Sequence, residues 1–191
     1  MRVLSWAVVA VLMLSGSIGF TTSIIPETAQ GLTQKANVIF VGTCLARSDK
    51  AGPPVTTDYT FNIETAIKGD LQANSTFALH QWRGTPIPIN RGGNRLATIP
   101  TYEVGQRYML FLTAPNVNGF RFPVGGGQGV FHVTESNGES IVAQDTLGGR
   151  WLFPEGGSQG VSLGKTIGGA PSHSLQLKEF VQAVRKMGGP Q

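Results

Sequence analysis

The sequence is poor in cysteine and in charge. Its 191 residues include one cysteine, Cys44, and 14% of the residues are charged. A single thiol cannot form a disulfide within the chain, so a disulfide-stabilised fold is excluded. The formal net charge is +4 at pH 7, but no run of Lys or Arg occurs. We therefore predict no basic nucleic-acid interface and expect no nucleic-acid partner.

The sequence also lacks the motifs that identify common active sites. Residues 160–166 resemble a phosphate loop but are one residue short between the glycines, and no predicted buried strand precedes them. His80, His132 and His173 lack the close spacing of a zinc site, and no second cysteine is available. No serine lies in a nucleophile elbow. We expect no metal or cofactor and predict that the protein is not an enzyme.

Glycine and proline are abundant, with 26 and 11 residues. Together with the few charges, they indicate many turns and hence β-structure. The apolar block 38–41 predicts a strand that is buried on both faces. Gly42 follows it, where we expect a bulge or a close approach of another backbone. Cys44 belongs to the same predicted strand, 38–46, so we expect a buried thiol.

Further strands are predicted along the chain. Residues 57–68 alternate at period two, which indicates a strand with one wet face. Its other face would carry Tyr59, Phe61, Ile63, Thr65 and Ile67. Segments 75–82 and 108–112 continue the sheet, and the second is apolar enough to be buried on both faces. At 120–124 we expect a short edge strand, because Pro123 cannot donate to a ladder.

The remaining elements are a hairpin and two helices. An Asn-Gly turn at 137–138 joins predicted strands at 130–133 and 140–143. Spacing of apolar residues by three and four predicts a short helix at 24–36 and a last helix at about 173–187. The sequence thus predicts one mostly β domain, with a short N-terminal helix and a C-terminal helix.

The first residues have the three parts of a signal peptide. Arg2 is positive, residues 3–14 are apolar apart from Ser5, and residues 15–19 are small or weakly polar. This pattern predicts cleavage before Phe20. The apolar stretch is shorter than a full span, so we favour cleavage over a retained anchor. We expect a secreted or periplasmic protein with no stable membrane span.

The predicted organisation is a signal peptide at 1–19 and a single β-barrel domain at 20–191. The core of the domain is expected at about 32–145 and is followed by a Gly-rich segment at 145–171. This length is sufficient for a domain with a substantial core.

A long segment, 83–100, interrupts the periodic pattern and is rich in Gly, Pro and Arg. Long loops in compact domains are often functional, and aromatic residues with arginine are typical of binding hot spots. The candidate partner-binding residues are Trp82, Arg83, Arg91, Arg95 and Tyr102. The alternative is that the tryptophan packs at a strand end and the arginines only keep the loop soluble.

The order of these segments resembles that of netrin-like domains. The matching segments are 35–43 (KANVIFVGT), 59–70 and 102–112, and residues 128–133 resemble a segment of exported bacterial proteins. The resemblance covers about residues 32–133 and implies an OB-type β-barrel, closed or partly open, which tissue inhibitors of metalloproteinases also have. Those inhibitors use an N-terminal cysteine and disulfides, which the mature start of this chain lacks. Inhibition therefore does not follow from the resemblance.

The sequence favours an exported, non-enzymatic binding module of the cell envelope or exterior. It gives no identity for the protein partner, and a relation to proteases stays open. One alternative is a structural or assembly subunit of the cell surface, and a weaker one is an enzyme whose site is assembled only in space. A stable monomer favours the first, self-assembly the second, and a perturbed carboxylate or histidine pair in a deep pocket the third.

We expect the exported protein to begin near Phe20, because the small residues before it form a cleavage site. N-terminal sequencing of protein collected outside the cytoplasm checks this. Recovery of a chain that still begins at Met1 from the membrane fraction would contradict it.

Overall fold

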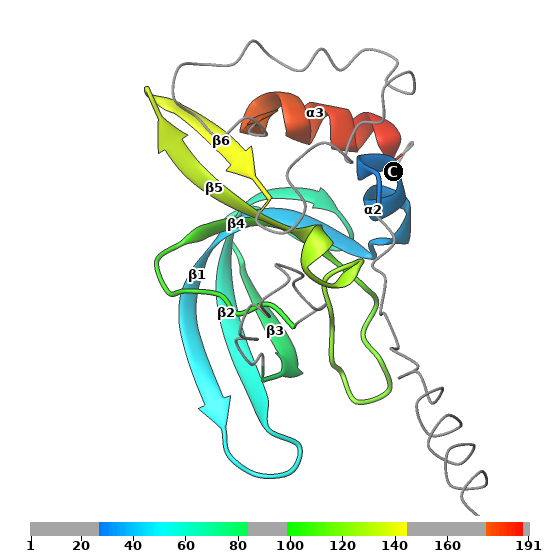
Figure 1. Ribbon diagram of the computed structural model, residues 1–191, viewed down its shortest axis with the longest axis vertical. Helices are drawn as coiled ribbons and strands as arrows, with labels where there is room; N and C mark the ends of the chain where they lie inside the picture. Colours follow the sequence, from blue (N-terminus) through cyan, green and yellow to red (C-terminus); the bar gives the residue numbers. More distant parts are fainter. Residues whose placement is uncertain (1–26, 84–98, 145–174, 189–191) are drawn as a thin grey trace, which may run out of the picture.

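The computed structural model describes residues 27–83, 99–144 and 175–188. Within them, seven strands form one antiparallel sheet in the order β3-β2-β1-β4-β5-β6-β7 (Figure 1). The strands are β1 (Val38–Lys50), β2 (Thr56–Lys68), β3 (Thr76–Trp82), β4 (Arg107–Leu112), β5 (Val130–Ser136), β6 (Glu139–Ala143) and β7 (Leu175–Gln176). The helices are α2 (Ala29–Lys35), α3 (Leu177–Met187) and the 3-10 turn η1 (Gly126–Gly129). The predicted mostly β fold with two flanking helices is confirmed, and the sheet is open, with edges at β3 and β7.

Strand β1 is an interior strand of the sheet, and its first residues, 38–41, are buried on both faces, as the apolar block predicts. Ile39 and Val41 belong to a core cluster on the helix side, which we call the helix-side core. Val38 and Phe40 belong to a second cluster on the opposite face, which we call the aromatic core. Strand β1 pairs with β2 on one side and with β4 on the other, so its alternating side chains supply both cores.

Strand β2 departs from the expected alternation at two bulges. Val41 pairs with Thr65 and Gly42 with Ile63, which leaves Glu64 without a direct partner in the ladder. The second shift lies where Ile39 pairs with Lys68 and Phe40 with Ala66. A bulge reverses the faces of the residues that follow it. The prediction of one continuous buried face is therefore wrong: Ile63 packs in the aromatic core and Ile67 in the helix-side core.

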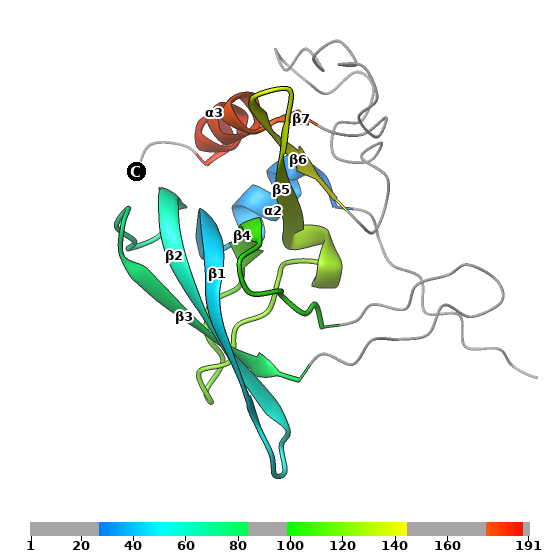
Figure 2. The ribbon, with the colours of Figure 1, turned by 90° about the vertical axis from the view of Figure 1, so that its left-hand side faces the viewer.

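Helices α2 and α3 lie side by side and cover the same face of the sheet (Figures 1 and 2). Thr28 caps the N-terminus of α2, and its Oγ1 accepts a hydrogen bond of 3.0 Å from the amide of Gly31. Leu32 of α2 and Phe180 of α3 are buried in the helix-side core. The apolar stripe of α3 also includes the buried Val181 and Val184, and it packs against the sheet.

Two elements differ from the sequence prediction. Residues 120–124 form no strand, and Pro123 makes an isolated bridge to Leu112. A proline that cannot donate to a ladder accounts for so short a pairing. Strand β7 was not predicted, because two residues are too few to show a period. It pairs with Ile141 and Val142 of β6 and so extends the sheet beside the start of α3.

The predicted signal peptide, 1–19, and the Gly-rich segment, 145–171, lie outside the described residues. Among the helices that the structure does describe, none has the length and apolar character needed to cross a membrane.

We expect Phe111→Ala to lower the free energy of unfolding by about 3–5 kcal/mol, because the ring is fully buried and packs against two other rings. Phe40→Ala, in the aromatic core, should cost about as much. Chemical denaturation measures both. Val117→Ala is the control, since Val117 is 100% exposed and its loss should change stability by about 0.5 kcal/mol or less. Parental stability of either phenylalanine variant would contradict this packing.

Candidate functional site

Trp82 lies at the end of the edge strand β3, and its side chain is 48% exposed. Two rings from the loop after β4 support it: the centroids of Phe120 and Phe122 lie 5.9 and 5.5 Å from that of Trp82. Phe120 is itself buried and stacks on His80, with ring centroids 4.4 Å apart. The two phenylalanine rings thus hold the indole in place, while about half of the tryptophan remains exposed to solvent.

Arg83 follows directly and is held in place by two contacts. Its amide donates to the carbonyl of Val55 at 3.0 Å, and its Nη2 donates to Oδ2 of Asp49 at 2.8 Å. Val55 is 44% exposed and precedes Thr56, the ladder partner of Trp82. We call Val55, Trp82, Arg83 and Phe122 the Trp82 surface.

Asp49 organises the charges beside this surface. Nε and Nη2 of Arg47 donate to its two oxygens at 3.1 and 3.0 Å, and the Thr57 hydroxyl donates at 2.8 Å. Arg83 is the third residue that donates to the Asp49 carboxylate, after Arg47 and Thr57. The hydrogen bonds from Arg47 and then from Thr57 hold the pKa of the Asp49 carboxyl at about 2.

A second carboxylate, Asp58, joins the β1–β2 hairpin to β3. Its Oδ2 lies 2.6 Å from Nζ of Lys50, and its Oδ1 contacts Nδ1 of His80. Burial raises the pKa of Asp58, but the hydrogen bonds from Lys50 and His80 outweigh it, so the pKa lies below its ordinary value. The pair of Asp58 and His80 is partly exposed and lies outside the pocket described below.

The other predicted contact residues are placed differently. Tyr102 is fully buried in the aromatic core, where its ring lies edge-on to Tyr59, Phe61 and Tyr108 at centroid distances of 4.9, 5.3 and 5.2 Å. Burial raises the pKa of its hydroxyl well above the ordinary value. Tyr102 therefore has no surface to offer a partner, and we do not retain it as a contact residue. Arg91 and Arg95 lie outside the described residues.

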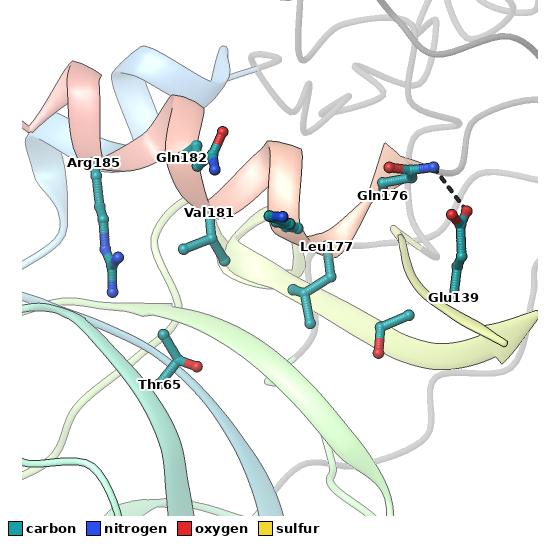
Figure 3. A pocket seen from close by; sticks show the side chains of 9 residues that line it. Thr65, Glu139, Gln176, Leu177, Val181, Gln182 and Arg185 are labelled. Atoms are coloured by element: carbon teal, nitrogen blue, oxygen red, sulfur yellow. Dashed lines mark hydrogen bonds between the residues drawn. The ribbon is translucent and has the colours of Figure 1, made fainter.

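A pocket of about 540 Å³ lies between α3 and the sheet (Figure 3). Its lining residues come from β2, β6, β7 and α3, and are Thr65, Glu139, Ser140, Gln176, Leu177, Lys178, Val181, Gln182 and Arg185. Figure 3 shows Leu177, Val181 and Arg185 pointing from the helix towards the sheet, with Thr65 beneath the arginine. Sequence reasoning missed this pocket, because the apolar stripe of α3 gives no sign that packing against the sheet leaves a hollow.

A charged network lies next to the pocket. Nη2 of Arg107 donates to Glu64 at 2.8 Å and its Nη1 to Glu135 at 2.7 Å, while the Thr43 hydroxyl donates to Glu64 at 2.6 Å. The hydrogen bonds that Arg107 donates to Glu64 raise the pKa of its guanidinium. Nη1 of Arg107 also lies 3.3 Å from Oγ of Ser140, a lining residue, so the network reaches the pocket wall.

Cys44 is fully buried, as predicted, and burial raises the pKa of its thiol. A buried thiol with a raised pKa is a poor nucleophile.

Within residues 27–83, 99–144 and 175–188 no group of three His, Cys, Asp or Glu side chains could hold a metal ion. Comparison with family models, curated proteins and solved structures finds no match for this chain.

We expect the pKa of Asp49, measured by NMR titration of its carboxyl carbon, to be about 2. This lies below the value of about 3.9 in an unfolded chain. Asp49 therefore stabilises the fold above about pH 3.9, and this contribution is lost as the pH falls through the folded pKa. Arg47→Gln should raise the pKa towards the unfolded value. Equal pKa values in parent and variant would show that Arg47 is not the cause.

Proposed function

We propose that this protein is an exported, non-enzymatic binding module that contacts a protein partner through the Trp82 surface. The observation that carries this proposal is the indole of Trp82, which is 48% exposed yet supported by Phe120 and Phe122. Tryptophan and arginine are enriched among the residues that contribute most to binding energy. A ring that is already fixed loses little conformational freedom when a partner covers it.

The charges beside the Trp82 surface also suit a binding role. Arg83 is tied to Asp49, which Arg47 and Thr57 hold in turn. Protein interfaces combine exposed aromatic residues with ordered polar groups of this kind. Among the described residues, the carboxylate and histidine pair of Asp58 and His80 lies outside the pocket under α3 and so gives the enzyme alternative no support.

We further propose that the sheet is an OB-type barrel of the netrin-like kind. The support is one hydrogen bond of 3.0 Å, from the amide of Arg121 to the carbonyl of His80 on the edge strand β3. The same loop bonds to the end of β4, where the amide of Thr113 donates to Phe122 at 2.9 Å. The loop thus bridges β3 and β4, as a closing strand would.

We expect the Arg121 amide to exchange its hydrogen slowly, because it is bonded to the carbonyl of His80. Exchange at the rate of an open loop, measured by NMR, would refute the bridge.

A structural or assembly subunit is the second candidate. The sheet has two edges, at β3 and β7. Because β7 has two residues, it pairs with Ile141 and Val142 alone, and the rest of β6 has no strand partner on that side within the described residues. Edges of this kind can pair with another chain. Ordered self-assembly in analytical ultracentrifugation would favour this candidate, and a stable monomer favours the binding module.

We expect Trp82→Ala to abolish or weaken capture of the partner at least tenfold, the scale of a hot-spot residue. The mature chain serves as bait for proteins from the cell exterior, and the captured protein is then titrated against each variant. Val104→Ala is the matched control, because Val104 is 58% exposed and lies outside the Trp82 surface. Thermal unfolding confirms that both variants fold. Equal affinity of the parent and the tryptophan variant would refute the proposal.

A further inference from the structure

The pocket under α3 combines an apolar wall with cations that have no acidic partner among the described residues. Leu177 and Val181 supply the apolar side, and Lys178 and Arg185 line the same hollow. Neither cation forms an ion pair within the part of the chain that the structure describes. The guanidinium of Arg185 makes one hydrogen bond, of 3.2 Å, to the carbonyl of Ala66. An arginine has five N–H donors, so most of them stay available.

The nearby carboxylates are already engaged. Glu139, the acidic lining residue, accepts a hydrogen bond of 2.7 Å from Gln176 at the far end of the pocket from Arg185 (Figure 3). Glu64 and Glu135 both bind Arg107 instead of a pocket cation. Among the described residues, the pocket therefore presents two positive charges against one carboxylate, which favours an anionic ligand.

Thr65 and Arg185 form the polar end of the pocket. The side chain of Arg185 extends from α3 towards Thr65 on β2 (Figure 3). Both residues line the pocket, and the planar fork of N–H donors of Arg185 suits a carboxylate. Val181 and Leu177 lie one and two turns before Arg185 on the helix, so an apolar wall runs about 12 Å from the polar end.

We propose that this pocket binds an amphipathic organic anion with a carboxylate head and an unbranched apolar tail. The head lies between Arg185 and Thr65, and the tail runs along Val181 and Leu177 towards the start of α3. The volume of about 540 Å³ is that of a small-molecule site, and such sites pair apolar walls with a few placed polar groups. This site lies apart from the Trp82 surface and does not depend on the proposed partner.

Binding of decanoate, measured by calorimetry and by NMR shifts of α3 amides, tests the proposal. Two probes separate head from tail: acetate carries the head alone, and decyltrimethylammonium carries the same tail with the opposite charge. We expect decanoate to bind at least tenfold more tightly than either. Equal binding of the cationic amphiphile would show adsorption to apolar surface and overturn the proposal, as would the absence of decanoate binding.

Two substitutions on α3 locate the head. Arg185→Gln should weaken decanoate binding about tenfold or more, because it removes a charge-assisted hydrogen bond. Lys186→Gln is the matched control: it removes a neighbouring positive charge from the same helix but does not line the pocket. It should leave the affinity unchanged. Equal effects of the two variants would mean that the general charge of α3, and not a head site at Arg185, attracts the anion.

Discussion

The close approach of β1 and β2 at Gly42 is the constraint on which the rest of the structure depends. A Cβ atom at this position would lie 2.4 Å from the carbonyl oxygen of Asn62, so a side chain there would force the strands apart. The register shifts at the same point, between Val41 and Gly42, and Glu64 is left over on β2. The absence of one side chain thus permits the bulge through which the apolar residues of β2 pack in the cores on both faces of the sheet.

The bulge also determines what the sheet presents beside α3. Because the faces of β2 change there, Thr65 lies on the helix side and reaches the pocket, while Glu64 meets Arg107 and Thr43. Without the shift, Thr65 would share a face with Ile63 in the aromatic core. The pocket and the charged network next to it are therefore consequences of strand register, and their residues come from segments far apart in the sequence.

This explains how much the sequence could predict. The apolar block before Gly42, the period of β2 up to Ile63 and the stripe of α3 are local patterns, and each was found. The face of Ile67 and the pocket were not, because a bulge depends on how two strands meet. Trp82 was selected for its neighbours in the chain, yet its support comes from Phe120 and Phe122, which only the fold brings near. Tyr102 was selected in the same way and is buried.

The two candidate sites differ in how their charges are satisfied, and this separates their modes of binding. Around the Trp82 surface the cations Arg47 and Arg83 already share Asp49, so a partner gains chiefly from covering apolar area. In the pocket, Lys178 and Arg185 have no acidic partner among the described residues, so the charged head of a ligand contributes to its binding together with the tail. Added salt weakens contacts between exposed charges far more than apolar contacts. A rise in ionic strength should therefore weaken the binding of a pocket ligand more than that of a partner on the Trp82 surface.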